Sequence, residues 1–376
     1  MRILLDYRPA LRDRSGVGEF VHGLARALAT RPGDDELAIL TTSWKDRPAP
    51  DLASELPGVA VVDRRIPVRA LTWMWNRMEW PPVEWLAGAA DVVHAQAPVL
   101  IPASRAAQVI TIHDLHFLAR PDRSVAEMRR DFPALVHEHA RRADHIVVSS
   151  AYAAGEVVRE LHVPPDRITV CPPGAPEWAA GIAAGRASRQ PGSAILFVGT
   201  LDLRKNIPVL LDAYAELRAR RPDAPPLVLA GRVTEAVRIE LGRTERSPLA
   251  GHVTVSGYVT HEERQRLYRE ARMLVLPSLE EGFGLPVLEA MACGLPVVVS
   301  NRGALPEVAG DAASPIDPLD ADALATEMER LLDPGAAGVA AANGLVRAAH
   351  YTWDATADAA RTAYRAAIAA RARRAG

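Results

Sequence analysis

The chain has 376 residues, which predicts two or three domains because a domain usually holds about 100–200 residues. Hydrophobic residues make up 49% and charged residues 24%, a balance that is typical of a globular protein and excludes an intrinsically disordered one. The net charge of −2 lacks the basic excess of a dedicated nucleic-acid-binding protein, so we expect no nucleic-acid partner.

The cysteines and the apolar runs indicate the cellular setting. Two cysteines, Cys171 and Cys293, cannot build a disulfide framework or a zinc site by themselves, which favours a reducing compartment. The first apolar run is too short for a signal peptide, and no stretch of about 18 uncharged apolar residues predicts a spanning helix. We therefore expect a cytoplasmic protein, with the inner face of a membrane as a second expected location.

The first half of the chain alternates short apolar runs with helical patterns. Residues 15–28 place apolar side chains at helical spacing, from Val17 to Leu28. Short apolar runs that alternate with helices are typical of buried parallel strands in βα units. The expected strands cover residues 3–5, 37–42, 59–63, 91–95, 108–114 and 145–150.

A proline- and glycine-rich segment interrupts this alternation and divides the chain. The alternation predicts two doubly wound, Rossmann-like α/β domains with parallel sheets. We expect a central cleft between them that faces the carboxyl ends of the strands. In the second domain we expect strands at 194–199, 226–231, 252–257, 273–278 and 296–301, and helices at 207–220, 260–271 and 285–293. The expected parts are an N-terminal domain (1–173), a linker (174–193), a C-terminal domain (194–353) and a terminal helix that crosses back to the N-terminal domain (354–376).

The segment 277–299 is the most informative motif. A strand ends, Glu281 and the loop Gly282–Gly284 follow, and a helix begins near Pro286. A helix N-terminus preceded by glycines suits a phosphate or a polarised sugar oxygen, and a carboxylate such as Glu281 or Glu289 can accept two hydrogen bonds from a sugar diol. The alternative is an ordinary strand-to-helix turn with two surface glutamates.

Two cations, Arg204 and Lys205, form the second motif. They stand between a strand that ends at Gly199 and a helix that begins near Ile207. At the carboxyl end of a strand they can clamp a diphosphate, because Arg offers a planar fork and Lys a point charge. The alternative is a solvated basic pair at a helix start, a placement that the helix dipole disfavours.

The N-terminal domain offers weaker signals. Gly16 and Gly18 follow the first strand but lack the third glycine of a dinucleotide-binding fingerprint. His113 ends a buried strand and can hydrogen-bond a sugar hydroxyl or act as an acid or base, with a structural histidine as the alternative. A metal held by His113 and His116 is disfavoured because no strict ligand pattern is present, so we expect no metal.

Aromatic and basic residues gather in one stretch of the N-terminal domain. Trp73, Trp75, Trp80 and Trp85 share residues 64–85 with four arginines. We favour a helix and loop packed on the N-terminal domain. An aromatic platform for an acceptor and a membrane-surface patch are the alternatives.

These motifs together resemble a known family. GTLDLRKN (199–206), followed by PSLEEGFGLPVLEAMACGLPVVVSNRGALPEV (277–308), resembles glycosyltransferase family 4, the retaining nucleotide-sugar-dependent enzymes with GT-B architecture. The mannosyltransferase-like branch of that family is similar to LLDYRPALRDRSGVGEFVHGLARAL (4–28), TIHDLHFLARP (111–121) and SGYVTHEERQRLYREARMLVLPS (256–278).

The resemblance implies a role for each matching position. The N-terminal domain would bind the acceptor and the C-terminal domain the nucleotide sugar. The implied catalytic residues are Arg204 and Lys205 on the diphosphate, Glu281 on hydroxyls of the donor sugar, and His113 facing the transferred sugar. The implied donor-binding residues are Gly16, Gly18, Gly199, Gly257, Tyr258, Val259, Gly282, Phe283, Gly284, Leu285 and Glu289, the last of which holds the ribose diol.

The implied reaction moves a hexosyl group, with mannosyl favoured, to a hydroxyl of a saccharide, a lipid-linked glycan or a natural product. GDP-mannose is the favoured donor, and UDP- and dTDP-sugars remain open. The reaction would retain configuration and need neither cofactor nor metal. A peripheral membrane contact through the N-terminal domain also stays open. The alternatives are a sugar-nucleotide epimerase of the same architecture and a non-catalytic nucleotide-sugar-binding protein.

Overall fold

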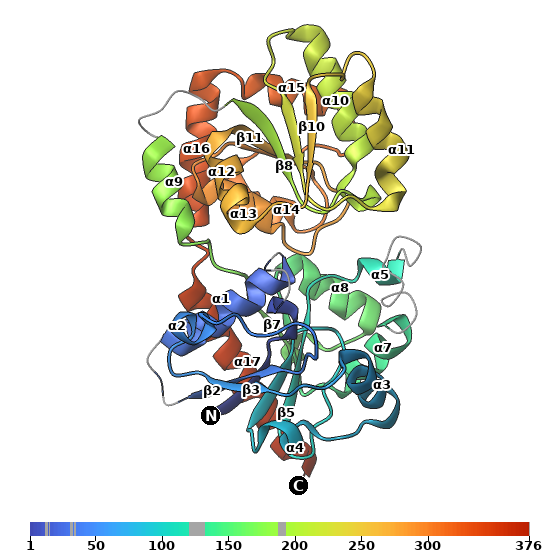
Figure 1. Ribbon diagram of the computed structural model, residues 1–376, viewed down its shortest axis with the longest axis vertical. Coiled ribbons are helices and arrows are strands. Elements are labelled where there is room, and N and C mark those ends of the chain that lie inside the picture. The colour runs from blue at the N-terminus through green and yellow to red at the C-terminus, as the bar shows by residue number, and fades with distance from the viewer. Residues whose placement is uncertain are drawn as a thin grey trace. The chain divides into compact units, whose positions relative to one another are not determined.

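The computed structural model describes residues 1–11, 14, 16–30, 33, 35–119, 132–186 and 193–375. The chain divides into two compact units, which Figure 1 colours along the sequence. Part of the expected linker, residues 187–192, lies outside the described residues. The first unit contains Met1–Gly174 and Thr352–Gly376, and the second contains Ala175–Tyr351.

The first unit is built on a parallel sheet of seven strands, in the order β3-β2-β1-β4-β5-β6-β7. The last strand was not expected from the sequence, because its three residues are too few for a periodic pattern to appear. The strands are β1 (Arg2–Asp6), β2 (Glu36–Thr41), β3 (Ala60–Asp63), β4 (Val92–Ala95), β5 (Ala107–Ile112), β6 (His145–Val148) and β7 (Ile168–Val170).

Helices cover both faces of this sheet. Alternating side chains of a strand enter opposite cores, so Leu4 packs in one hydrophobic cluster and Leu5 in the other. The cluster that holds Leu5 includes side chains of α1 (Val17–Thr30) and α17 (Trp353–Ala375). The opposite cluster includes side chains of α3 (Val68–Met78), α7 (Phe132–Arg142) and α8 (Ala151–Leu161).

The C-terminal helix α17 belongs to the first unit, where it packs on α1 and on strands β5, β6 and β7 (Figure 1). The buried Tyr364 hydroxyl lies 2.8 Å from Nδ1 of His94. Nε of Arg361 lies 2.8 Å from Oδ2 of Asp35, which also binds the N-terminal ammonium group at 3.1 Å. These contacts join the two ends of the chain into one core.

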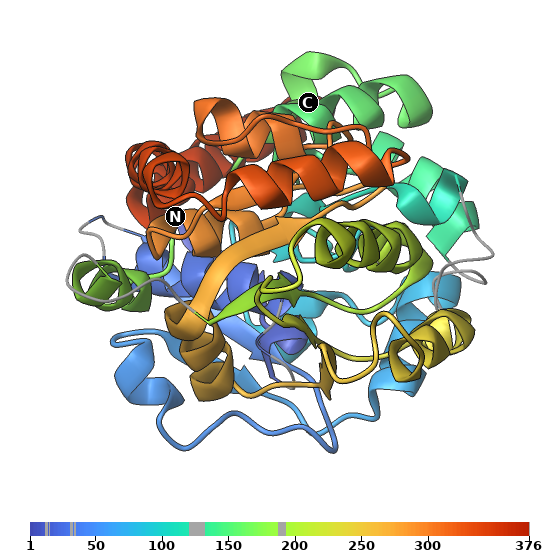
Figure 2. The same ribbon diagram turned by 90° about the horizontal axis from the view of Figure 1, so that it is seen from above.

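The second unit is built on a parallel sheet of five strands, in the order β10-β9-β8-β11-β12. Its helices include α10 (Ile207–Arg220) and α15 (Ala321–Arg330), which lie side by side (Figure 2), and α12 (His261–Glu270), α13 (Leu285–Ala292) and α16 (Pro334–Ala348). The strands are β8 (Ala194–Val198), β9 (Leu227–Ala230), β10 (Val253–Gly257), β11 (Ala271–Leu276) and β12 (Val297–Val299).

A helix, α9 (Trp178–Arg186), occupies part of the segment 174–193 that was expected to be a linker. Pro176 stands before the helix, and four of the nine helix residues are alanines, which favour helix. The helix packs through the ring of Trp178, whose centroid lies 5.8 Å from that of Tyr268. This stretch is therefore part of the second unit.

Candidate functional site

The two predicted motifs of the second unit meet at the carboxyl ends of neighbouring strands. Strand β8 leads into a short 3₁₀ helix that carries Arg204 and Lys205, and β11 leads into the loop that carries Glu281. Nζ of Lys205 forms an ion pair with Oε1 of Glu281, and Nη1 of Arg204 lies 3.7 Å from Oε2 of Glu281. Residues 76 positions apart in the chain thus form one charged cluster.

The Glu281 carboxylate is held in its ionised form. Its residue is only 6% exposed, and burial opposes ionisation. The charges of Lys205 and Arg204, together with the hydroxyl of Ser278, which donates to Oε1 at 2.8 Å, nevertheless lower its pKa below the ordinary value. The site therefore presents two cations around a buried carboxylate.

Asn206 holds the two loops of the cluster in register. Its backbone is left-handed, with φ of +59°, a conformation that Asn tolerates better than most residues. Its amide Nδ2 donates to the carbonyl of Pro277 at 3.2 Å and to that of Pro318 at 2.6 Å. Sequence reasoning missed this residue. Its only signal was an Asn placed between a cationic pair and a helix start.

The glycine-rich loop before α13 takes the predicted form. Gly284 has φ of +100°, and a Cβ atom there would lie 2.5 Å from Cδ2 of Leu305, so no larger residue fits without a shift. Pro286 occupies the first turn of α13. Phe283 is buried, with its ring centroid 5.6 Å from that of Tyr351. The N-terminus of α13 and its amide groups therefore follow directly on the Glu281 loop.

A second glycine shapes the Glu281 loop from outside the motif. Gly303 has φ of +62°, and a Cβ atom at this position would lie 2.6 Å from the backbone nitrogen of Glu281. The backbone after β12 therefore approaches the loop closely. Sequence reasoning did not single out Gly303, because nothing local indicates what its missing side chain would meet.

Glu289 lies in α13 among partners from α12. Tyr268 donates its hydroxyl to Oε2 of Glu289 at 2.7 Å, and Nη1 of Arg264 lies 3.2 Å from Oε1. Burial and the Glu289 charge raise the pKa of Tyr268 well above its usual range, so the phenol stays protonated and donates. Sequence reasoning missed Arg264 and Tyr268, although their four-residue spacing places them on one helix face.

The remaining predicted residues of the second unit follow β8 and β10. Gly199 has φ of +148°, and a Cβ atom on the neighbouring Gly231 would lie 1.8 Å from its carbonyl oxygen. Gly257 ends β10 with φ of +69°, and the Tyr258 side chain after it is exposed. Because the sheet is parallel, Gly257 at the end of the outermost strand β10, and Tyr258 and Val259 after it, lie at the same edge as the charged cluster.

In the first unit, His113 follows β5 as predicted. Its ring meets that of Phe20 edge-on, with centroids 5.3 Å apart. Its Nε2 atom is buried and has no hydrogen-bond partner in the part of the chain that the structure describes. Burial lowers its pKa to about 4, so the ring is neutral at neutral pH. Gly16, with φ of +56°, and the buried Gly18 stand at the start of α1.

The tryptophan-rich stretch packs on the first unit as expected, but it buries only part of its aromatic surface. Trp75 is buried in α3, but Trp73, Trp80 and Trp85 are 59%, 47% and 69% exposed. Trp73 and Trp85 lie on the exposed sides of α3 and of the short helix α4 (Val83–Ala87), whose buried residues are on the other side, and Trp80 lies in the loop between the two helices. Of the four indole rings, only that of Trp75 is buried in the core of the first unit.

The described residues offer neither a cluster of metal ligands nor a membrane-spanning helix. They contain no group of three His, Cys, Asp or Glu side chains that could hold a metal ion. None of the helices within the described ranges is long and apolar enough to cross a bilayer.

Both units match family models. Residues 14–177 match the model described as Glycosyltransferase Family 4, and residues 192–334 match the model described as Glycosyl transferases group 1. O-antigen chain mannosyltransferase B of Escherichia coli is 32% identical to this chain over 373 residues, which cover 94% of this chain and 97% of that protein.

Solved structures share the fold over almost the full chain. Sucrose-phosphate synthase from Thermosynechococcus elongatus has a TM-score of 0.77 at 24% identity, covering 97% of this chain and 98% of that one. Anabaena Alr3699/HepE, solved with UDP-glucose, has a TM-score of 0.69 at 16% identity, covering 96% and 98%. The chain belongs to glycosyltransferase family 4 and is a glycosyltransferase enzyme of the GT-B fold, with two Rossmann-like domains.

Proposed function

We propose that this enzyme transfers a hexosyl group, with mannosyl favoured, from a nucleotide-diphosphate sugar to an acceptor hydroxyl. The observation that carries the proposal is the convergence of Arg204, Lys205 and Glu281 beside the N-terminus of α13. The similarity to an O-antigen mannosyltransferase supports mannosyl and hence GDP-mannose. The likeness to a structure solved with UDP-glucose supports a nucleotide sugar and keeps UDP- and dTDP-sugars open.

The charged cluster supplies the chemistry of leaving-group departure. Glycosyl transfer builds negative charge on the departing diphosphate and positive charge on the sugar ring. Arg204 and Lys205, with the amide groups at the start of α13, stabilise the diphosphate. Glu281 holds hydroxyls of the transferred sugar next to the reacting carbon. Attack from the same face, with the departing phosphate taking the acceptor's proton, gives retention.

The other proposed roles orient the donor. In this scheme Glu289 holds the ribose diol, and Gly257, Tyr258 and Val259 border the nucleobase. Gly199, Gly282, Phe283, Gly284 and Leu285 are proposed to contact the diphosphate and the sugar. In the acceptor-binding first unit, Gly16 and Gly18 are proposed to meet the diphosphate. His113, which is neutral, then offers a sugar hydroxyl a hydrogen bond without adding charge.

The identity of the donor is tested by a thermal-shift panel of GDP-, UDP- and dTDP-sugars. A ligand at 100 times its dissociation constant should stabilise the protein by about 2.7 kcal/mol. GDP-mannose should give the largest shift, and the product should keep the α-configuration of the donor when its anomeric proton is examined by NMR. Hydrolysis or epimerisation of the donor as the sole turnover would contradict transfer.

Metal independence is a separate part of the proposal. It rests on Arg204 and Lys205, which supply the positive charge at the diphosphate that a divalent cation supplies elsewhere. Transfer should therefore continue in excess EDTA. Complete loss of activity that magnesium or manganese restores would contradict this part.

We also propose that the first unit contacts an anionic membrane surface. Exposed indole rings at Trp73, Trp80 and Trp85 are suited to the bilayer interface. Four exposed arginines of the same stretch add attraction to anionic lipids, and they are Arg64, Arg65, Arg69 and Arg77.

A further inference from the structure

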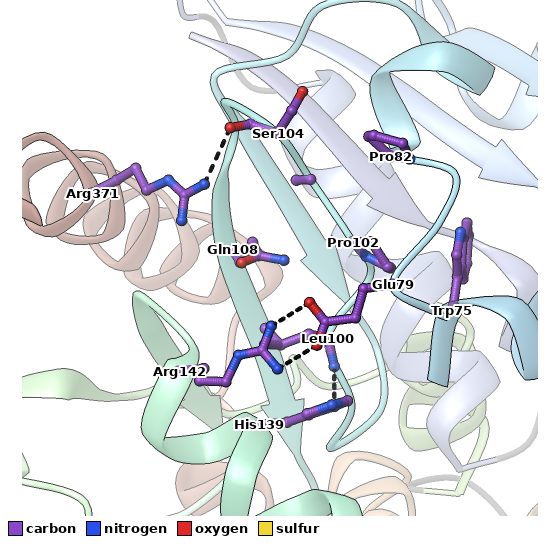
Figure 3. Close-up of a pocket in the computed structure, with 11 residues that line it drawn as sticks. Trp75, Glu79, Pro82, Leu100, Pro102, Ser104, Gln108, His139, Arg142 and Arg371 are labelled. Atoms are coloured by element: carbon purple, nitrogen blue, oxygen red, sulfur yellow. Dashed lines mark hydrogen bonds and ion pairs between the residues drawn. The ribbon is translucent and has the colours of Figure 1, made fainter. Parts of the chain in front are cut away.

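A cavity of about 340 Å³ opens in the first unit, at the amino end of β5 (Figure 3). His113 follows the carboxyl end of the same strand, so the cavity lies at the opposite edge of the sheet from the proposed chemistry. The side chains that matter to its chemistry are Glu79, Gln108, His139, Arg142 and Arg371.

The acidic group of this cavity, Glu79, is paired with an arginine. Nη1 and Nη2 of Arg142 lie 2.5 and 2.7 Å from Oε1 and Oε2 of Glu79, so the two side chains form a bidentate ion pair. The hydrogen bond from Arg142 holds the pKa of Glu79 below its usual range, although burial opposes this. Arg142 also pairs with Glu138, with Nη1 2.8 Å from Oε1, so it offsets only part of the carboxylate charge beside the cavity, and Arg371 supplies the second cation of the lining.

His139 offers a hydrogen-bond donor whose tautomer can be derived. The backbone N–H of Leu100 donates to its Nδ1 atom at 2.9 Å, so Nδ1 carries no hydrogen. Burial and the Arg142 charge lower the pKa of His139, which keeps the ring neutral. The single ring proton must then sit on Nε2, and His139 contributes an N–H group to the cavity.

Arg371 and Gln108 complete the polar wall. Arg371 comes from α17, and its Nη2 donates to the carbonyl of Ser104 at 3.3 Å, which anchors the guanidinium beside the cavity (Figure 3). Gln108 donates its Nε2 to the carbonyl of Ile101 at 2.8 Å, so its Oε1 remains as an acceptor. The wall thus combines a cation and a neutral donor with one acceptor.

We propose that this cavity binds the phosphate of a glycerophosphate group, supplied by the headgroup of a membrane lipid. Phosphate oxygens would accept hydrogen bonds from Arg371 and from Nε2 of His139, and a headgroup hydroxyl would donate to Oε1 of Gln108. The lipid source is favoured because the exposed rings of Trp80 and Trp85, 5.8 Å apart, belong to the segment that supplies Trp75 and Pro82 to the cavity wall. This inference rests on the membrane contact proposed above and not on the reaction.

The first arm of the test uses a soluble probe, sn-glycerol 3-phosphate, in calorimetric titrations. Arg371→Gln should weaken its binding roughly ten- to hundred-fold, since a charge-assisted contact is lost. His139→Asn keeps an acceptor for Leu100 but removes the Nε2 donor, and should weaken binding about five-fold. Arg365→Gln is the matched control, because Arg365 is an exposed arginine of the same helix, and it should bind as the unaltered protein does.

Failure of sn-glycerol 3-phosphate to bind, or equal binding by Arg371→Gln and the unaltered protein, would overturn the site.

The second arm compares vesicles of phosphatidylcholine with vesicles that also contain phosphatidylglycerol. Phosphatidylglycerol should increase binding. Arg371→Gln should reduce that increase, although the share due to Arg64, Arg65, Arg69 and Arg77 remains, and Arg365→Gln should leave the increase intact. Equal losses in both variants would overturn the lipid source, since general charge attraction would then explain the binding. Nucleotide binding by Arg371→Gln should be unchanged, which separates this site from the proposed function.

Discussion

Lys205 and Glu281 form a buried ion pair in which each charge makes the burial of the other tolerable. Removing one partner leaves a buried charge with less compensation, which typically costs about 3–5 kcal/mol. Lys205→Met should therefore lower the free energy of unfolding by an amount of that order, and should weaken binding of a nucleotide diphosphate. Urea unfolding and calorimetry measure the two effects. Lys45→Met, which removes an exposed lysine, is the control and should change neither.

The same pair predicts a pH dependence. The pKa of Glu281 is lowered in the folded protein, so its stabilising contribution is present above the ordinary value of 4.5 and is lost as pH falls through the folded value. Lys205→Met should raise that pKa. The stability difference between the two proteins should be largest at neutral pH and should narrow on acidification. A difference that stays constant over this range would mean that Glu281 titrates alike in both proteins.

Substitution of Glu281 and substitution of Glu289 should affect different steps, turnover in the first case and nucleotide binding in the second. Glu289→Gln should weaken binding of both the nucleotide sugar and the bare nucleotide diphosphate, because the ribose is common to both. Glu281→Gln should leave bare-nucleotide affinity nearly unchanged and lower kcat by about ten-fold or more, since its contact strengthens in the transition state. Titration and steady-state rates give the comparison. The donor orientation is wrong if only Glu281→Gln loses bare-nucleotide binding.

At the residue scale, contiguous motifs were predictable and distant partners were not. Arg204, Lys205 and Glu281 could be singled out because each stands at a strand end beside glycines or another cation. Asn206 binds Pro318 from 112 positions away. The conformation of Asn206 depends on a contact that only the folded chain creates, so no local pattern could indicate it.

Among the elements, α13 depends on the glycine that precedes it. Gly284→Ala places a Cβ where φ is +100° and where Leu305 lies 2.5 Å away. The substitution should cost about 1–3 kcal/mol of stability and should displace the helix start, with weaker nucleotide binding. Gly338→Ala in α16 is the control, because its added methyl group meets nothing and its backbone is unstrained. That variant should be stabilised by about 0.4–1 kcal/mol. Thermal unfolding of both variants gives the comparison, and equal effects would contradict the assignment.

Apolar runs made the buried strands the most predictable elements. The runs at 195–198 in β8 and 273–276 in β11 are continuous because parallel strands are covered on both faces. The helix α9 was hidden by the prolines before it. The exposed rings around α3 could not be foreseen, since a tryptophan-rich helix predicts burial and only neighbouring elements decide which rings are covered.

For the whole molecule, the two units should unfold as separable transitions. Arg361→Gln breaks the ion pair with Asp35 in the first unit and should lower only that unit's transition temperature. A bare nucleotide diphosphate should raise the transition of the second unit, by about 2.7 kcal/mol at 100 times its dissociation constant. Differential scanning calorimetry separates the two. If the protein shows one unfolding transition and both treatments shift it, the two units do not unfold independently.

The placement of α17 in the first unit has a consequence for synthesis on the ribosome. The core around Tyr364 cannot close until the last residues of the chain emerge, although Met1–Gly174 is made first. At about 5–20 residues per second, the intervening stretch of roughly 200 residues takes roughly 10–40 s to translate. Throughout that interval the nascent first unit exposes the groove that α17 will fill, whereas the second unit has all five of its strands as soon as Val299 has been made.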